Sequence, residues 1–184
     1  MIIKLLIGLG NPSDEYKNNR HNSGFLFLDF LKDKSEIQTH RNIHWTTDIK
    51  HQSILCRGEN YLCVKPQTYM NLSGVSVSSL MSYYKIKTDD IIVFHDDLDI
   101  ALGKYKIEFG HGPKMHNGIT SIEQSIHTQD FWRVRIGIDA RNSENKIKGI
   151  DYVLQNFSNE ERVILNDTFS ILLENIINKK IINW

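Results

Sequence analysis

Polar residues that could do acid–base chemistry gather in five short segments of the chain, mostly where an apolar run ends. These segments are GLGNP (8–12), RHNSG (20–24), YMNLSG (69–74), HDDLD (95–99) and HNG (116–118). In α/β proteins, ligands bind at the carboxyl ends of the strands, so we expect these segments to meet in one site. Each segment alone also fits a blander interpretation, since a histidine or asparagine before a helix is often a cap or a core residue.

Together, the segments offer a histidine, an aspartate and three asparagines that suit hydrolysis by water at neutral pH. His21, with an ordinary side-chain pKa of about 6.5, can take a proton from water and pass it on. An aspartate behind it would fix its tautomer and stabilise its protonated form. Carboxamides can orient the water or donate to a developing oxyanion. Because no serine or cysteine lies in a recognisable nucleophile elbow, direct attack by water is the predicted mechanism.

Neither a metal nor a cofactor is expected from the sequence. His95, His111 and His116 lie close together, but their spacing fits no common zinc pattern. The two cysteines, Cys56 and Cys63, each lie in a short β-like run. They are expected to be buried free thiols in a reducing cytoplasm, with a disulfide as the alternative.

Length and composition predict one globular domain, residues 1–184. The chain is 40% hydrophobic and 24% charged, and its apolar N-terminus has no basic leader or cleavage site, so it is expected to be the first strand. No apolar run approaches the roughly 18 residues of a membrane span. The formal net charge is zero, yet basic residues outnumber acidic ones from Lys104 to Lys148. That stretch would suit either phosphate binding or a solvated charged surface.

Apolar runs of strand-like and helix-like length alternate along the chain. Strands are predicted at residues 1–8, 53–57, 61–65, 91–94, 104–109 and 131–138, with a hairpin turn at 58–60. Helices are predicted at 23–32, at 71–84, from about 117, and from 158 to about 179, where Ser158 and Glu161 form a capping box. This order predicts an α/β fold with a mixed, mostly parallel twisted sheet flanked by helices.

Two of the predicted helices contain apolar residues that we expect to face the core. In the helix at 71–84 these are Leu72, Val75, Leu80, Met81 and Tyr84. In the last helix they are Val163, Ile164, Phe169, Leu172, Leu173 and Ile176.

In this order and spacing, the polar segments resemble those of bacterial peptidyl-tRNA hydrolases. The resemblance spans roughly residues 2–157 and also includes EY (15–16), PQTYMNLSG (66–74) and RVRIGI (133–138). It implies a metal-independent enzyme that hydrolyses the ester between a peptide, or an N-blocked aminoacyl group, and the 3′ end of tRNA. It also implies a cytoplasmic monomer.

Carried over residue by residue, the resemblance implies a role for each member of the site. His21 would be the general base and Asp96 would hold and polarise it. The substrate-binding residues would be Asn11 and Asn71 at the ester and peptide end, Asn117 at the water or peptide, and Tyr16 and Met70 along the cleft.

The same resemblance places tRNA phosphate at Arg135, which matches a basic residue that the family uses for this purpose. Arg133, Lys104 and Lys106 are further candidates, chosen for their charge and location. Glu108, however, lies where the family often has a basic residue, so the phosphate patch is expected to be weaker.

Other departures from the family pattern concern loops. Ser13 replaces a glycine and Asn19 a threonine. Pro113, Lys114 and Met115 precede His116 in a loop that is rich in glycine and small residues elsewhere in the family. Replacing glycines by larger residues restricts the backbone and adds bulk, so this loop is expected to be reshaped.

Two other functions would also suit parts of the sequence. The first is an RNA-binding module on the same fold without catalysis, since a fold alone does not fix function. Substitution of His21 would distinguish the two, because a binder would keep its RNA affinity. The second is a dinucleotide-binding oxidoreductase, based on GLGNPS (8–13) after the first strand. The third glycine is missing and Pro12 interrupts the expected helix start, so this alternative is disfavoured.

Overall fold

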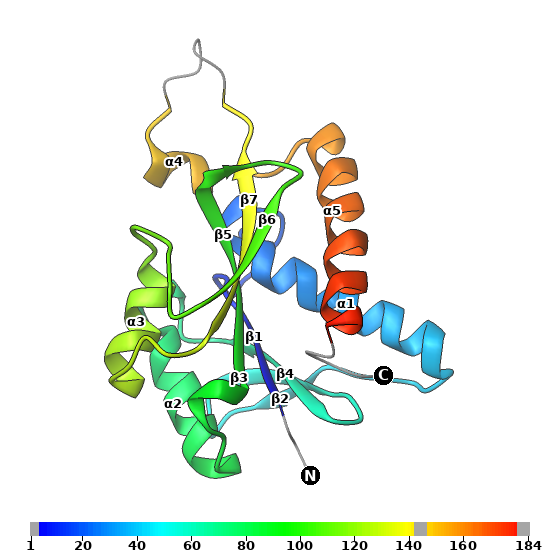
Figure 1. Cartoon of the computed structure of the whole chain (residues 1–184), viewed down its shortest axis with the longest axis vertical. Helices are drawn as coiled ribbons and strands as arrows, with labels where there is room; N and C mark the ends of the chain where they lie inside the picture. The colour runs from blue at the N-terminus through cyan, green and yellow to red at the C-terminus, as the bar shows by residue number, and fades with distance from the viewer. Residues whose placement is uncertain (1–3, 142–146, 180–184) are drawn as a thin grey trace.

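A single seven-stranded sheet forms the centre of the computed structural model, which describes residues 4–141 and 147–179 (Figure 1). The strand order is β2-β3-β4-β1-β5-β7-β6. The strands are β1 (Lys4–Gly8), β2 (Thr46–Asp48), β3 (Ser53–Arg57), β4 (Tyr61–Pro66), β5 (Ile91–Ala101), β6 (Tyr105–Phe109) and β7 (Trp132–Asp139). Residues 1–3 of the predicted first strand lie outside the described residues.

The predicted α/β fold with a mixed sheet is confirmed. The central strands β4, β1, β5 and β7 are parallel, as consecutive partners in the sheet. The flanking pairs β2–β3, β3–β4 and β6–β7 are antiparallel, and β3 and β4 form the predicted hairpin around residues 58–60. Parallel and antiparallel pairings are therefore equally represented, with the parallel ones at the centre where the polar segments converge.

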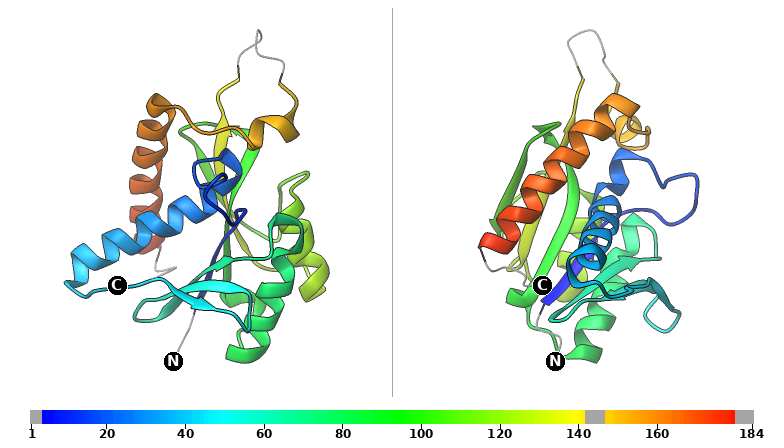
Figure 2. Two further views of the ribbon diagram at one scale, coloured as in Figure 1. Left: turned by 180° about the vertical axis from the view of Figure 1, so that it is seen from behind. Right: turned by 90° about the vertical axis from the view of Figure 1, so that its right-hand side faces the viewer.

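Helices cover both faces of the sheet (Figures 1 and 2). They are α1 (Ser23–Thr39), α2 (Ser73–Tyr84), α3 (Asn117–Ile126), α4 (Gly149–Val153) and α5 (Asn159–Asn178), with short 3-10 turns at Arg20–Asn22, Met70–Leu72 and Thr88–Asp90. Helices α1 and α5 lie on one side of the sheet and α2 and α3 on the other. None of the helices within residues 4–141 and 147–179 is long and apolar enough to cross a membrane.

Alternation along the strands divides the apolar core into two layers. On β1, Leu6 packs in the layer that contains residues of α1 and α5, whereas Leu5 and Ile7 pack with α2 and α3. Cys56 and Cys63 lie directly opposite each other on β3 and β4, and both are buried free thiols as predicted. The first layer supports the start of α1, and the second supports α3, so both layers position the polar segments.

The last helix begins with the predicted capping box, because Ser158 accepts the Glu161 amide and the Glu161 side chain accepts the Ser158 amide. The prediction that Val163 and Ile164 are buried is wrong, since they are 61% and 44% exposed. Leu165 is buried instead, in phase with the buried residues further along α5. The capping box fixed where the helix starts but not which side of it faces the sheet.

The helix at 71–84 shows a similar departure. Leu72 and Val75 are exposed rather than buried, and Val77 joins Leu80 in the core. The reason is that Leu72 belongs to the 3-10 turn that precedes α2, so the helical phase begins at Ser73. Met81 and Tyr84 pack at the edge of the core, as expected.

Strand β5 is longer than predicted, and this changes the setting of the site. It was expected to end at residue 94, with the acidic segment following it, but it continues to Ala101. Asp96 and Asp97 are therefore buried strand residues. They remain in the sheet because each carboxylate is paired, Asp96 with histidines and Asp97 with an arginine.

Candidate active site

A close contact between helix and sheet brings His21 over Asp96. Gly24, in the first turn of α1, packs against the end of β1 and the middle of β5: a Cβ there would lie 2.2 Å from the Phe94 carbonyl oxygen and 2.5 Å from the Leu9 nitrogen. Only glycine allows this approach. The 3-10 turn Arg20–Asn22, directly before α1, is thereby held beside the middle of β5.

His21 and Asp96 form a hydrogen-bonded pair. Nδ1 of His21 lies 2.8 Å from Oδ1 of Asp96, and both side chains are largely buried. Because an ionised carboxylate only accepts hydrogen bonds, the ring proton is on Nδ1. Nε2 of His21 is then the basic nitrogen, and His21 lines the cleft described below.

A second histidine, His116, shares the same carboxylate oxygen. Its Nε2 lies 3.0 Å from Oδ1 of Asp96, while its Nδ1 accepts the amides of Gly118 and Ile119 and caps α3. Since Nδ1 is an acceptor, the proton must be on Nε2, which donates to Asp96. The sequence had suggested the HNG segment but assigned no role to His116; a histidine directly before a helix was the available signal.

A third histidine, His95, supports this arrangement from inside the sheet. Its Nδ1 donates to the main-chain carbonyl of Asp96 at 2.7 Å, and its ring meets that of His116 edge to face at 4.8 Å. Complete burial, with a smaller contribution from His116, lowers the pKa of His95 well below its ordinary value, so the ring is neutral. Its Nε2 finds no hydrogen-bond partner in the described part of the chain.

The charges of this cluster tune one another. Burial alone would raise the pKa of Asp96, but the neighbouring His21 and His116 hold it far below its ordinary value, so Asp96 is ionised. Burial alone would lower the pKa of His21, but the charge and hydrogen bond of Asp96 outweigh this and raise it. His21 is therefore a stronger base than an ordinary histidine, as a general base near neutral pH requires.

His21, Asp96 and His116 are also close enough to be considered as metal ligands, with potential ligand atoms within 4.8 Å of one another. In the arrangement described, however, the two histidine nitrogens that face Asp96 each carry a proton bonded to Oδ1. A metal would have to displace both protons. The geometry therefore favours proton transfer over metal binding by these three residues.

Asn11 is oriented by its neighbours. Its side-chain oxygen accepts the Met70 amide at 2.9 Å, so its NH2 group remains available to the cleft. Its main chain forms two hydrogen bonds with the side chain of Asn22, at 2.8 and 2.9 Å. Asn11 thus offers a fixed hydrogen-bond donor of the kind that can stabilise an oxyanion.

A cleft of about 800 Å³ opens in front of His21. Its polar wall contains Asn11, Asn71 and Asn117 in addition to His21 and Asp96; its apolar wall contains Met70, Leu98, Met115, Ile150, Val153 and Leu154. Asn71 and Asn117 are exposed; Asn71 lies in the 3-10 turn before α2, and Asn117 is the first residue of α3. The cleft is large enough for part of a peptide and joins an apolar surface to hydrogen-bonding groups.

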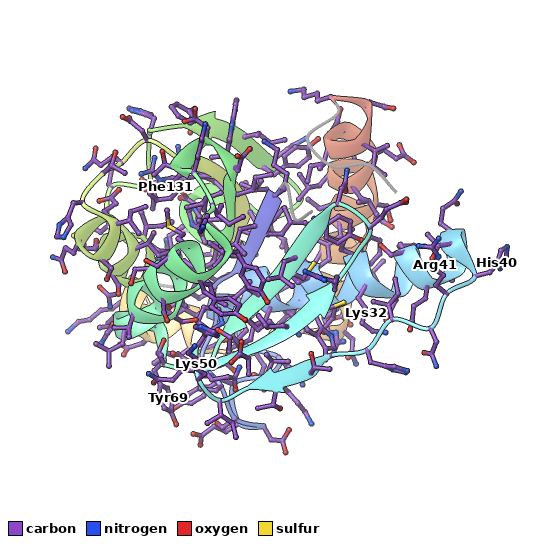
Figure 3. All side chains as sticks on the ribbon, turned by 90° about the horizontal axis from the view of Figure 1, so that it is seen from below. Lys32, His40, Arg41, Lys50, Tyr69 and Phe131 are labelled. Atoms are coloured by element: carbon purple, nitrogen blue, oxygen red, sulfur yellow. The ribbon has the colours of Figure 1, made fainter. Side chains whose placement is uncertain are left out.

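Tyr69 stands at the rim of this cleft, and Figure 3 shows it at the periphery of the molecule. Its main chain has φ 58° and ψ 164°, a conformation that residues other than glycine rarely adopt. The sequence did not predict this feature. Tyr16, which was expected to line the cleft, is not among the residues that form its walls. Tyr16 lies near Tyr69 instead. The pKa of Tyr16 is raised, mainly by the charge of Glu15 and to a smaller extent by Tyr69.

The candidate phosphate ligands separate into two groups. Lys104 and Lys106 are exposed on and beside the edge strand β6. Arg133 is 1% exposed, and its guanidinium bonds Glu123 at 2.7 Å and lies over the Phe131 ring. Arg135 is also buried and is bonded to two carboxylates. Among these four residues, only the two lysines present to solvent a charge that is not paired within residues 4–141 and 147–179.

Comparison with known proteins gives a consistent result. The family model for peptidyl-tRNA hydrolase matches residues 5–181. A peptidyl-tRNA hydrolase from Mycoplasmopsis synoviae is 42% identical over 163 residues, which cover 89% of this chain and 82% of the relative. One from Thermotoga sp. (strain RQ2) is 40% identical over 170 residues, which cover 92% of this chain and 87% of the relative.

Solved structures of peptidyl-tRNA hydrolases have the same fold as this chain. A peptidyl-tRNA hydrolase crystallised with N-propanol superposes with a TM-score of 0.83 at 33% identity, covering 95% of this chain and 86% of that one. The enzyme from Acinetobacter baumannii gives a TM-score of 0.78 at 31% identity, covering 96% of this chain and 91% of that one. With its matching fold and its cleft built around His21 and Asp96, this chain belongs to the peptidyl-tRNA hydrolase family, whose members are ester hydrolases acting on peptidyl-tRNA.

Proposed function

We propose that the chain hydrolyses peptidyl-tRNA by water that His21 activates. The observation that carries this proposal is the bond from Nδ1 of His21 to Asp96, which leaves the basic Nε2 for the cleft. The water oxygen would attack the ester carbonyl carbon while its proton moves to Nε2. When the bond between that carbon and the ribose oxygen breaks, the same proton would pass to the ribose oxygen. Free tRNA and the carboxylic acid of the peptide result, and at neutral pH this acid releases its remaining proton to solvent.

The asparagines would bind the reacting group. The Asn11 NH2 is fixed by the Met70 amide and suits the oxyanion that develops on the carbonyl oxygen. Asn71 would bind the ester and peptide end, and Asn117, beside His116, would position the water or the peptide. Asp96 would stabilise the positive charge on His21, and His116 would hold Asp96 in place.

The apolar wall of the cleft and the exposed lysines outside it would bind different parts of the substrate. Met70 and the apolar wall suit the peptide, whereas the exposed Lys104 and Lys106 suit tRNA phosphate outside the cleft. We assign the phosphate contact to these lysines rather than to Arg133 and Arg135, because both guanidinium groups are buried against carboxylates. Tyr16, near Tyr69, would contact the substrate only at the rim.

The remaining expectations follow from this substrate. We propose that the chain acts as a single domain, because all seven strands within the described residues belong to one sheet. It would act as a monomer in the cytoplasm, where peptidyl-tRNA is produced, and without a cofactor, because a histidine–aspartate pair and asparagines supply the groups that the hydrolysis needs.

The test is release of free tRNA from N-acetyl-aminoacyl-tRNA in the presence of a chelator, for wild type and His21→Ala. General-base catalysis contributes about a hundred- to ten-thousand-fold, so His21→Ala should lose at least that much kcat while still binding tRNA. A variant as fast as wild type would refute His21 as the base. A wild type that binds tRNA without turnover would instead indicate the RNA-binding module considered above.

A further inference from the structure

Arg135 lies in the middle of β7. To bind a phosphate, its guanidinium group would have to be exposed and unpaired. Its side chain is only 9% exposed. Nε donates to Oδ2 of Asp97 at 2.7 Å and Nη1 to Oε2 of Glu108 at 2.5 Å. The two carboxylates come from strands on either side, β5 and β6. One guanidinium thus bridges three neighbouring strands diagonally, because Asp97 is in register with Gly137 and Glu108 with Arg133.

The loop between β6 and α3 rests on the same guanidinium. A Cβ at Gly112 would lie 2.5 Å from Nη1 of Arg135 and 2.7 Å from Cζ, so the Gly112 main chain packs directly against the charged group. Gly112 also has φ +64°, which glycine adopts without strain. The departures Lys114 and Met115 follow in this loop, and His116 ends it. Arg135 therefore supports the segment that leads to His116.

Both contacts adjoin groups that act on His21. Asp97 follows Asp96 directly, and its second carboxylate oxygen accepts the Asp99 amide at 2.8 Å, which shapes the end of β5. His116 donates to Asp96. We propose that Arg135 is a positioning residue: by holding Asp97, Glu108 and the Gly112 main chain together, it keeps Asp96 and His116 in place behind His21. This inference rests on the roles proposed above for His21 and Asp96.

The local charge balance supports positioning over phosphate binding. One positive group faces two carboxylates, so the cluster of Arg135, Asp97 and Glu108 carries an excess of negative charge. The hydrogen bond from Arg135 lowers the pKa of Glu108, which keeps this carboxylate ionised at neutral pH. A phosphate would have to displace one of these carboxylates and the Gly112 main chain. Glu108, which departs from the family pattern, fits here as a partner of Arg135.

The first experiment compares wild type, Arg135→Gln and Arg135→Lys in kcat, KM and the dependence of KM on salt, with N-acetyl-aminoacyl-tRNA. A displacement of about 1 Å in a catalytic group can cost on the order of a hundredfold in rate. Arg135→Gln should therefore lower kcat by roughly that factor while the salt dependence of KM stays at the wild-type value. Arg135→Lys should restore little, because an ammonium group cannot bridge both carboxylates as the planar fork does.

A pH profile separates positioning from a general loss of packing. If Asp96 is displaced, it raises the pKa of His21 less, and the acid limb of kcat/KM in Arg135→Gln should move to lower pH. An unchanged limb together with a lower kcat would overturn the proposal. So would a raised KM, a salt dependence weakened by about one unit of slope and an unchanged kcat, because these identify a phosphate contact.

Glu108→Gln provides a milder variant in case Arg135→Gln does not fold, since Glu108 is a partly exposed edge residue. Positioning predicts a several-fold lower kcat. Masking of a phosphate ligand predicts a lower KM with kcat unchanged, and that result would overturn the proposal. The matched control is Glu123→Gln. Glu123 is the carboxylate partner of Arg133, which lies on β7 like Arg135, and its substitution should leave kcat unchanged. Equal losses of kcat in Glu108→Gln and Glu123→Gln would also contradict a specific role for Arg135.

Discussion

The side chain of Asn22 accepts a hydrogen bond from the main-chain amide of Asn11 and donates one to its carbonyl. The two segments GLGNP and RHNSG are therefore joined directly beside His21. Asn22 is 2% exposed. Because Asn11 in turn accepts the Met70 amide, one chain of hydrogen bonds fixes the direction in which the Asn11 NH2 points. The orientation of the proposed oxyanion donor is thus set by a residue that does not itself line the cleft.

Asn22→Ala should therefore impair catalysis even though Asn22 does not line the cleft. Loss of one oxyanion donor costs about a hundred- to a thousand-fold in kcat, and a misdirected Asn11 should approach the lower value. Unpaired buried groups should also lower the free energy of unfolding by about 1–3 kcal/mol. Steady-state kinetics and thermal unfolding measure both effects. Asn19→Ala, at an equally buried neighbour that makes neither bond to Asn11, is the control; an equal loss of kcat there would refute this role of Asn22.

The activity should fall as pH decreases through the raised pKa of His21, because only the neutral imidazole can accept a proton from water. Asp96→Asn removes the charge that raises this pKa, while burial, which lowers it, remains. The acid limb of kcat/KM should then move to lower pH, and kcat at neutral pH should drop by up to about ten-thousand-fold as the tautomer is lost. A profile of kcat/KM against pH tests this. An acid limb that is unmoved in Asp96→Asn would show that another group controls it.

Lys104→Ala and Lys106→Ala should each weaken tRNA binding without affecting chemistry. Both side chains are exposed and lie outside the cleft. KM should rise in each variant, the slope of log KM against log salt concentration should decrease by about one, and kcat should be unchanged. Lys34→Ala, at an exposed lysine on α1, is the matched control. Identical salt slopes in all three variants and wild type would place the tRNA elsewhere.

Met115→Gly should change the preference for the peptide end. Met115 is 91% exposed and belongs to the apolar wall of the cleft with Ile150 and Leu154. Burial of apolar surface contributes about 25 cal/mol per Å², so contact with a leucine side chain of the substrate is expected to contribute about 1 kcal/mol, or roughly fivefold in kcat/KM. N-acetyl-leucyl-tRNA should lose this factor and N-acetyl-glycyl-tRNA should not. A common loss on both substrates would point to a change in the loop rather than in specificity.

The sequence was sufficient to identify the fold class and the segments that form the site. Alternating strand and helix lengths gave the α/β arrangement, and the polar segments do converge at the middle of the sheet, around Asp96. His21 and Asp96 are 75 positions apart in sequence and meet because β1 and β5 are parallel neighbours below the start of α1. Residue types at the ends of apolar runs were the useful signal.

The sequence could not predict which charged side chains are buried, because that depends on the partners they meet from other strands and helices. A run such as RVRIGI does not reveal that Glu123, Asp97 and Glu108 will face its two arginines, because those partners come from α3, β5 and β6. Burial of Arg133 and Arg135 follows from these partners and not from local pattern. The exposure of Val163 had a similar cause: the side of α5 that meets the sheet is chosen by its neighbours.

Asp96 and Asp97 are consecutive residues of β5, and their side chains bond to different partners, Asp96 to His21 and Asp97 to Arg135. Successive residues of a strand point to opposite faces, so a slip of one residue would exchange them. Insertions or deletions in β5 upstream of Asp96 should therefore abolish activity even where the fold tolerates them. Surface loops that hold no residue of the site carry no such constraint, so length variation among homologous sequences should fall in such loops and be absent from β5.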